Sequence, residues 1–385
     1  MAKNKKRLKV LSLKEIDKRY GTTSMASAIL VENDRSLRIP SRCPWLTWQL
    51  GGGLPYGKIT EIFGYQSTGK SLLAMDFGVV TQQLGGIVIW ADAEQCFDML
   101  WAKQVGMDLD KLYIFDKTNA IEKISDWIKD MVIATRSMLT NNEPILVVID
   151  SIAALDTDVN VGSEQTDKKA QMGNRAKAIG DMWRYRNSDF HQYGATVIAI
   201  NQIRKKLGVS MFESDITQPG GEATKFYSSI RISINRGKQI KGIVNSKGFR
   251  EDSSGVKFGQ NVFVGIDKNK TAPPRNNIKT QVYFLPDIYG YVGYSKYGGM
   301  ADILISHGIL DKKGNAYVFT SKGEEIKLCG KYDDIDISLE NNPTYRKKLL
   351  KKLGVNLVST TDEKLKSLGK NMYPVIGTVD GEEED

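Results

Sequence analysis

The residues 64–71, with the sequence GYQSTGKS, have the types and spacing of a phosphate-binding loop. They fit the pattern G-x-x-x-x-G-K-[ST], in which glycines let backbone N–H groups curl around phosphates. In this pattern the lysine, Lys70, reaches the β- and γ-phosphates, and the hydroxyl of Ser71 holds Mg²⁺. The residues expected to contact a nucleotide are Gly64, Tyr65, Gln66, Ser67, Thr68, Gly69, Lys70 and Ser71. The alternative is a glycine-rich turn followed by a surface lysine.

Acidic and amide side chains follow apolar segments elsewhere in the chain, where a parallel sheet would bring them to one edge. Asp150 stands where P-loop enzymes place the group that orients the water shell of Mg²⁺. Either Asp92 or Glu94 could orient the water that attacks the γ-phosphorus, although a helix N-cap is a second role for Asp92. Gln202 ends another apolar segment, so its amide is also expected to point toward the phosphates.

Near-continuous apolar strands that alternate with helical patterns make up the middle of the chain. Because strands of this kind are buried on both faces, they predict the α/β class, with a central, mostly parallel sheet covered by helices. The first strand enters the phosphate loop and a helix at 72–80 leaves it, so the loop lies at a strand-to-helix turn. The expected strands are 59–63, 87–91, 112–115, 145–149, 195–200 and 228–234.

Two longer helices are expected to cover this sheet. Asn119, with Glu122 three residues later, has the signature of a helix cap. A second helix is expected over 170–186, where Lys177 and Arg184 share a basic face suited to phosphates. An ordinary solvated face is the alternative. The side chains that the second helix is expected to bury are Met172, Ala176, Ile179 and Trp183.

The composition is that of a globular chain with a mild excess of positive charge. The formal net charge of +9 suggests a polyanionic partner, although many basic proteins this mild need none. Basic residues gather before residue 20 and acids at 380–385, with solvated ends as the alternative for each. The cysteines, Cys43, Cys96 and Cys329, fit reduced thiols in a cytoplasm. No segment is expected to cross a membrane or to act as a secretory signal.

Several motifs in collinear order together resemble those of the bacterial and phage RecA recombinases. The resemblance covers about residues 10–355, and motifs shared with P-loop ATPases in general account for only a small part of it. The motifs are Gly52-Gly53-Leu54-Pro55, residues 64–71, Asp92-Ala93-Glu94, residues 147–155, Asn201-Gln202-Ile203-Arg204, Gly220-Gly221, Lys225-Phe226-Tyr227 and Lys268-Asn269-Lys270.

The resemblance implies a RecA-like P-loop ATPase core with an N-terminal helix-and-strand arm and a small α/β C-terminal domain. It implies an oligomerisation arm at 1–35, an ATPase and DNA-binding core at 36–280, a C-terminal domain at 281–370 and an acidic tail at 371–385. Such a protein uses ATP and Mg²⁺, forms a helical filament on single-stranded DNA, and exchanges strands with homologous double-stranded DNA. Single-strand-binding and loader proteins would be its further partners in the cytoplasm.

In the nucleotide site, the resemblance implies that Glu94 is the general base and that Gln202 senses the γ-phosphate. Lys268 and Lys270 match lysines that reach ATP from the neighbouring subunit, where they neutralise transition-state charge much as an arginine finger does. The residues that fall where the family contacts adenine are Asp98 and Trp101. The usual tyrosine is replaced by tryptophan at the second position, and stacking should survive that change.

For DNA, the resemblance implies contacts that neutralise the backbone and do not read the bases, as a recombinase serving any homologous pair requires. The long polar loop at 203–221 carries some of these residues, and a second polar loop is expected at 157–170. The expected backbone contacts are Lys177, Arg184, Arg204, Gly220 and Gly221, and the apolar side chains expected between base triplets are Met172 and Leu207. The acids that depart from the family pattern there are Glu213, Asp215 and Glu222.

Two other functions are consistent with part of the pattern. A ring-forming P-loop motor of the replicative-helicase type would depend on an arginine finger from the neighbouring subunit, whereas this chain has lysines at 268 and 270. A nucleotide-gated DNA scaffold with negligible hydrolysis would not depend on Glu94. Replacement of Glu94 by glutamine therefore distinguishes an ATPase from a scaffold.

Overall fold

The structure is a computed structural model that describes most of the chain between residues 37 and 358. The described residues are 37–139, 142–161, 168–205, 216–217, 221–245, 248–251, 255–273, 275, 277–285, 292–354, 356–358 and 374–376. The predicted arm at 1–35 lies outside them, as does the predicted tail at 371–385 apart from Pro374–Ile376. Within these ranges, no helix combines the length and apolar character needed to cross a membrane.

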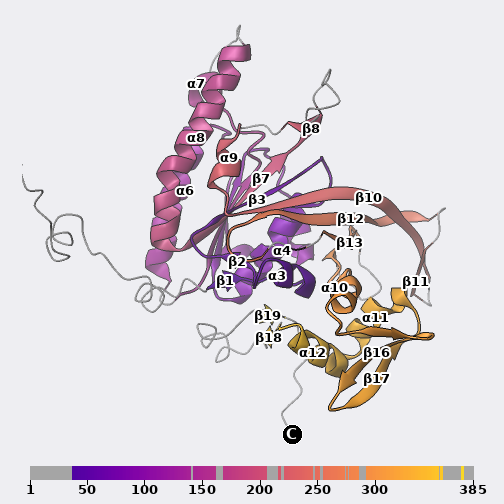
Figure 1. Cartoon of the computed structure of the whole chain (residues 1–385). Coiled ribbons are helices and arrows are strands. Elements are labelled where there is room, and N and C mark those ends of the chain that lie inside the picture. The colour runs from indigo at the N-terminus through magenta and orange to yellow at the C-terminus, as the bar shows by residue number, and fades with distance from the viewer. Residues whose placement is uncertain are drawn as a thin grey trace, which may run out of the picture. The chain divides into compact units, whose positions relative to one another are not determined.

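A ten-stranded sheet forms the centre of the described chain (Figure 1). Its order is β14-β13-β12-β10-β3-β7-β6-β4-β5, with β11 paired to β10. The strands from β10 to β5 run parallel, and β11 to β14 are added in antiparallel fashion, so the predicted mostly parallel α/β sheet is confirmed. The bounds are β3 Ile59–Gly64, β4 Ile87–Asp92, β5 Leu112–Phe115, β6 Ile145–Asp150, β7 Ala195–Gln202, β10 Ile230–Asn245, β11 Gly248–Glu251, β12 Val256–Asn269, β13 Ile278–Tyr283 and β14 Gly293–Tyr294.

Helices on both faces of the sheet explain why its middle strands are apolar throughout. In β4, Val88 and Trp90 pack into one core while Ile89 and Ala91 pack into the other, because successive side chains of a strand point to opposite faces. Helices α3, α4 and α5 contribute to the first core, and α6 and α8, which lie side by side in Figure 1, contribute to the second. The bounds are α3 Pro44–Gln49, α4 Lys70–Gln83, α5 Met99–Val105, α6 Ile121–Met138 and α8 Lys168–Tyr193.

The start of α6 differs from the sequence prediction. Its N-cap is Ala120, which has no side-chain cap bond. Asn119 Nδ2 instead donates to the Ala154 carbonyl oxygen over 3.0 Å, and Glu122 accepts the backbone N–H of Asp158 over 2.9 Å. The predicted cap is therefore wrong, because both side chains bond the segment that follows β6.

The same segment is more helical than the sequence predicts. Helix α7 (Asp158–Val161) lies inside the loop expected at 157–170, and α8 begins at Lys168 and continues to Tyr193. Ile179 and Trp183 are fully buried on α8, as predicted. The prediction of a continuous loop is wrong because helical turns form at both of its ends.

The C-terminal part carries a smaller sheet of three antiparallel strands, β15-β16-β17, together with helices. Strand β13 of the central sheet spans the predicted domain boundary at 280/281, and α10 is the first element after that sheet. The bounds here are α10 Met300–Ser306, β15 Asp311–Lys313, β16 Ala316–Ser321, β17 Glu324–Cys329, η2 Tyr332–Asp334, α11 Ile335–Asn341 and α12 Pro343–Lys352. The remaining short elements are β1 Arg38–Ile39, β2 Leu54–Pro55, η1 Leu109–Lys111, β8 Arg204–Lys205, β9 Ile216–Thr217, α9 Ala223–Tyr227, β18 Asn356–Val358 and β19 Pro374–Ile376.

Candidate active site

The glycine-rich loop joins β3 to α4, the strand-to-helix context that the sequence predicts. Gly64 lies so close to β10 that a Cβ atom there would stand 2.2 Å from a backbone oxygen, and Gly69 caps α4 with a φ of +93°. Both positions therefore favour glycine. The Lys70 ammonium donates to the Tyr65 carbonyl oxygen over 2.7 Å, which closes the loop on itself. The N-terminus of α4 at this loop offers the backbone N–H groups that bind anions.

Three side chains from distant strands hold carbonyl oxygens of the loop. Arg236 donates to the carbonyl oxygens of Gln66 and Ser67 over 2.8 and 3.2 Å, and Gln260 donates to the second of these over 3.2 Å. The Tyr294 hydroxyl donates to the carbonyl oxygen of the α4 N-cap residue over 3.1 Å. Sequence reasoning missed all three, because they lie 169 to 225 residues away from their partners and no spacing marks them.

A cavity of about 290 Å³ lies beside the loop. Its volume is close to the lower end of the range for small-ligand sites. The walls include Trp101 of α5, so the structure brings this ring to the loop, as a base-stacking role requires. Asp98 caps α5 and accepts the backbone N–H of Trp101 over 3.0 Å, which orients that residue. The lining residues are Ser67, Thr68, Gly69, Lys70, Ser71, Leu72, Trp101, Lys257 and Phe284.

The cavity wall also contains Lys257 and Phe284, which sequence reasoning did not single out. The Lys257 ammonium lies 5.2 Å from the centre of the Phe284 ring, within the range of a cation–π contact. One residue comes from β12 and the other follows β13, so only the pairing of these strands places them together. They add a cation and an apolar ring to the wall that Trp101 shares.

Asp150 ends β6 beside the loop and is buried. Burial raises the pKa of this carboxyl to about 7; a hydrogen bond from Ser71 and the charge of Lys70 oppose the rise, and Glu94 and Asp92 add to it. Burial also lowers the pKa of the Lys70 ammonium. The Ser71 hydroxyl and the Asp150 carboxylate offer oxygen ligands of the kind that Mg²⁺ prefers. Among the described residues no three His, Cys, Asp or Glu side chains are grouped so that they could hold a metal ion by themselves.

Glu94 is exposed in the turn after β4, with one carboxylate oxygen held by two donors. Gln202 Nε2 donates to Glu94 Oε1 over 2.8 Å, and the Ser151 hydroxyl donates to the same oxygen. Asp92 is buried, and its carboxylate accepts a backbone N–H within the turn. The helix-cap role considered for Asp92 is wrong, because the N-cap of α5 is Asp98. Of the two acids, Glu94 is the one accessible to a water molecule.

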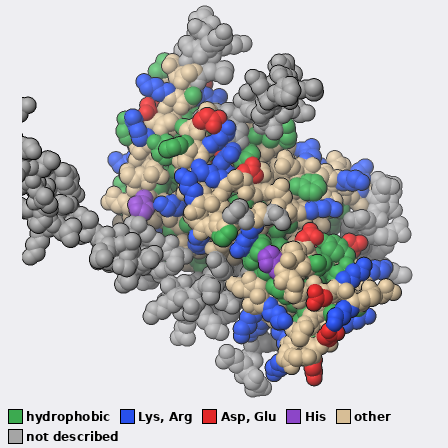
Figure 2. All heavy atoms as spheres, in the orientation of Figure 1, with side chains coloured by type: hydrophobic (Ala, Val, Ile, Leu, Met, Phe, Trp, Pro, Cys, Tyr) green, Lys and Arg blue, Asp and Glu red, His purple; other side chains and the backbone are tan. Residues whose placement is uncertain are grey.

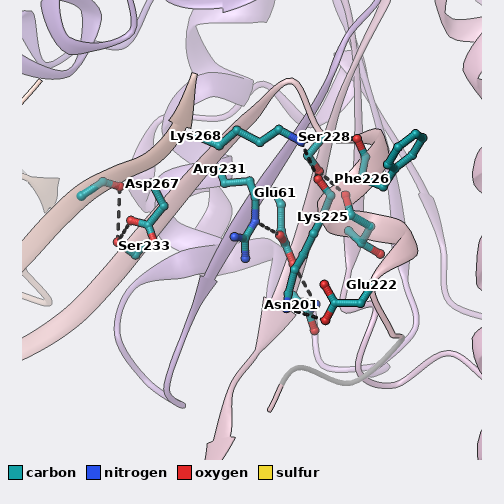
Figure 3. A network of polar contacts seen from close by, with 12 residues as sticks. Glu61, Asn201, Glu222, Lys225, Phe226, Ser228, Arg231, Ser233, Asp267 and Lys268 are labelled. Atoms are coloured by element: carbon teal, nitrogen blue, oxygen red, sulfur yellow. Dashed lines mark hydrogen bonds and ion pairs between the residues drawn. The ribbon is translucent and has the colours of Figure 1, made fainter. Parts of the chain in front are cut away.

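Lys268 is directed to the end of α9 in its own chain (Figure 3). Its ammonium donates to the carbonyl oxygens of Lys225 and Phe226 over 2.6 and 3.3 Å. Burial lowers its pKa, and the charges of Lys270 and Arg231 add to this effect. Neither Lys268 nor Lys270 lines the cavity beside the loop.

The basic candidates on α8 are exposed. Lys177 is exposed, and Arg184 forms an ion pair with Asp181 over 2.9 Å and donates to the Tyr185 hydroxyl over 2.9 Å. Figure 2 shows Lys and Arg side chains scattered over the face on which α6 and α8 lie. A phosphate at this face would have to compete with Asp181 for the Arg184 guanidinium.

The glycine candidate Gly221 has a φ of +70°, and a Cβ atom there would stand 3.5 Å from the Ala176 side chain on α8. The next residue, Glu222, forms an ion pair with Lys225 over 2.7 Å, so this acid is partnered within the chain. Of the predicted DNA contacts, Leu207 and Gly220 lie outside the described residues. Met172 lies in α8 and Arg204 in β8, but the description does not extend to their side chains.

Comparison of the sequence with known proteins shows the family to which the chain belongs. Residues 6–289 match the RecA N-terminal domain. The chain belongs to the RecA family. The RecA protein of Tropheryma whipplei is 34% identical over 343 residues, which cover 88% of this chain and 70% of the relative. The RecA proteins of Mycobacteroides abscessus and Aquifex aeolicus are 33% and 32% identical, over 92% and 84% of this chain and 94% and 85% of their own lengths.

Membership in the RecA family confirms the resemblance seen in the sequence motifs. The chain is a RecA-family recombinase that binds ATP and belongs with proteins of DNA recombination and repair. The matched part contains the phosphate loop, the acids at the sheet edge and both lysines at 268 and 270. The C-terminal three-stranded sheet lies beyond it.

Proposed function

We propose that this RecA-family chain is a DNA-dependent ATPase that polymerises on single-stranded DNA, pairs it with homologous duplex and exchanges the strands. The hydrogen bond from Gln202 to Glu94, beside Asp150 and Lys70 at one sheet edge, is the observation that carries the proposal. It joins an acid accessible to water with an amide on the strand that leads into the loop at 203–221. An ATPase whose state reaches a DNA-binding loop needs a link of this kind.

Bound ATP would supply the phosphoanhydride bond that water cleaves, and Mg²⁺ would neutralise charge on its phosphate oxygens. Lys70 would neutralise phosphate charge, and Ser71 and Asp150 would hold the cation. Glu94 would orient the water and accept its proton, while Gln202 keeps the carboxylate in place. These groups lie close together in the described chain, which supports the proposed roles.

The second half of the site would come from the next protomer. Lys268 and Lys270 would add positive charge to the neighbour's phosphates, as an arginine finger does, in a head-to-tail contact that extends into a helical filament. The DNA backbone would be neutralised by Lys177, Arg184 and Arg204 together with the backbone at Gly220 and Gly221, with Met172 and Leu207 between base triplets. Single-strand-binding and loader proteins in the cytoplasm are proposed as further partners, and membership in the RecA family is the only basis for them.

Mixing two inactive variants tests this shared site. Glu94→Gln removes the base and Lys268→Ala with Lys270→Ala removes the lysines, so each protein alone should hydrolyse ATP poorly with single-stranded DNA. In an equal mixture about a quarter of the head-to-tail contacts combine an intact half from each variant, and activity should return in proportion. In the control mixture, Lys313→Ala, on β15, replaces the lysine variant. That mixture should show no more ATP hydrolysis than its Lys313→Ala protein shows alone.

Persistent inactivity of the mixture, with both variants folded and nucleotide bound, would rule out a site shared between protomers. Electron microscopy with single-stranded DNA and a slowly hydrolysed ATP analogue adds a second criterion. Helical filaments support the proposal, whereas closed rings would favour the motor of the replicative-helicase type. Unchanged turnover in Glu94→Gln would instead favour a nucleotide-gated scaffold.

A further inference from the structure

A row of charged side chains crosses three neighbouring strands of the sheet (Figure 3). Glu61 on β3 is the register partner of Arg231 on β10, and Arg231 is the partner of Lys268 on β12. Side chains at paired positions lie side by side on one face of a sheet. The side chain of Glu61 has no exposed surface and that of Arg231 is only 15% exposed. The proposed function uses Lys268 but gives the buried acid no role.

Both carboxylate oxygens of Glu61 are bonded, each to a different strand. Oε1 accepts Asn201 Nδ2 of β7 over 2.9 Å, and Oε2 accepts Arg231 Nε of β10 over 2.6 Å. The Arg231 guanidinium also lies 4.3 Å from the centre of the Phe63 ring. A buried ion pair adds little to stability compared with an apolar pair of the same size, because both charges lose their hydration. The contribution of Glu61 is therefore in geometry: it fixes two strands relative to each other.

On the nucleotide side, Glu61 is connected to the proposed base by consecutive hydrogen bonds. Asn201 donates to Glu61 and accepts, through Oδ1, the backbone N–H of Gln202 over 3.0 Å. Gln202 Nε2 then donates to Glu94 over 2.8 Å. If the Gln202 backbone shifts as its amide turns toward a phosphate, the shift would therefore act on Asn201, and through it on Glu61.

On the other side, the row ends at a β-bulge that sets the direction of Lys268. Arg231 pairs with Lys268 but the next residue of β10 pairs with Ile266, so Asp267 is the extra residue of β12. The Ser233 hydroxyl holds Asp267 over 2.6 Å. Bulges redirect the side chains beside them. The Lys268 ammonium consequently reaches the last carbonyl oxygens of α9, the helix that follows the loop at 203–221.

We propose that Glu61 is a positioning residue that couples Gln202, on the nucleotide side of the sheet, to Lys268 and α9. The inference rests on the proposed function in so far as that function assigns nucleotide roles to Gln202 and Lys268. Glu61 holds β7 and β10 together, so a shift of the β7 end changes the position of Arg231. Arg231 and Lys268 lie side by side and both are positively charged. A change in the position of Arg231 therefore alters the hydrogen bonds from Lys268 to α9.

Hydrogen exchange in the full-length protein tests the coupling without DNA. The probe is adenosine 5′-O-(3-thiotriphosphate) with Mg²⁺, and the readout is amide exchange in the peptide 223–231, which contains α9. Glu61→Gln alone would take away the acid that pairs with Arg231 inside the sheet and could fail to fold, so the principal variant is E61Q/R231Q. The matched control is D76N/R42Q, because that ion pair is 2.5 Å long, equally buried and outside the row.

In the unmodified protein the nucleotide should slow exchange in this peptide by roughly tenfold. E61Q/R231Q should bind the nucleotide within about threefold of the unmodified protein but lose the slowing, whereas D76N/R42Q should retain it. Full slowing in E61Q/R231Q would overturn the proposal, as would its loss in D76N/R42Q or its absence from the unmodified protein. ATP hydrolysis that single-stranded DNA fails to stimulate would count against the proposed function instead, and the exchange result would still stand.

Discussion

The Gln202 amide donates a hydrogen bond to Glu94 Oε1 over 2.8 Å, which links the end of β7 to the turn after β4. The Ser151 hydroxyl, which follows β6, donates to the same oxygen. Three strand ends therefore converge on one carboxylate. The second oxygen accepts the Cys96 thiol, a weak donor, over 3.9 Å, and is therefore the one suited to meet water.

Glu94→Gln should lower ATP hydrolysis about 100-fold or more, because the amide cannot accept a proton from water. Gln202→Ala should lower it roughly tenfold, because one donor to the carboxylate is lost. Nucleotide binding should change little in either variant, which a fluorescent ATP analogue measures. Asp110→Asn, an exposed acid in η1, is the control and should keep full turnover. Equal turnover of Glu94→Gln and the unmodified protein would contradict the assignment of Glu94 as the base.

Trp101→Ala should weaken nucleotide binding about tenfold, because stacking on the base and burial of the ring are both lost. Trp101→Tyr should remain within about threefold, since the smaller ring still stacks. Equilibrium titration with ATP and with a base-free triphosphate separates the two effects, because the base-free ligand should not distinguish the variants. An equal loss for both ligands would show that Trp101 supports the loop and not the base.

Arg236→Ala should weaken triphosphate binding roughly tenfold, because two carbonyl oxygens of the loop lose a charged donor. The exposed neighbour Lys238→Ala removes the same charge two residues away and serves as the control. Titration calorimetry measures both. Matching losses in the two variants would indicate a general effect of charge and would count against a specific contact with the loop.

Asp336 in α11 should make stability depend on pH. Burial raises the pKa of its carboxyl to about 7, although backbone N–H groups of Gly299 and Ala301 oppose the rise. Between about pH 4 and pH 7 the unfolded chain ionises this group while the folded chain does not, so stability falls as pH rises through that window. Asp336→Asn should therefore raise Tm by several degrees at pH 8 and little at pH 4.

Thermal unfolding at a series of pH values checks the Asp336 prediction. Asp311→Asn, an exposed acid on β15, serves as the control and should show no such trend. A difference in Tm between Asp336→Asn and the unmodified protein that stays constant from pH 4 to pH 8 would contradict the assigned titration.

The sequence by itself determined the features that depend on neighbouring residues. The loop at 64–71, the strands on either side of it and the acids at strand ends follow from spacing, because a short motif and apolar runs are local properties. The family also followed from motifs in collinear order, and the comparison confirmed it. The cap predicted at Asn119 failed because its side chain found a long-range partner, which no local pattern records.

Only the tertiary structure decided which residues support and connect the site. Arg236 and Gln260 reach the loop, and Lys257 reaches the cavity, because β10 and β12 extend the sheet beyond β3. The link from Glu61 to Asn201 and Arg231 likewise exists only through strand register. The physical reason is common to all: these contacts join residues far apart in the chain, and pairing of whole strands, not the identity of neighbouring residues, brings them within bonding distance.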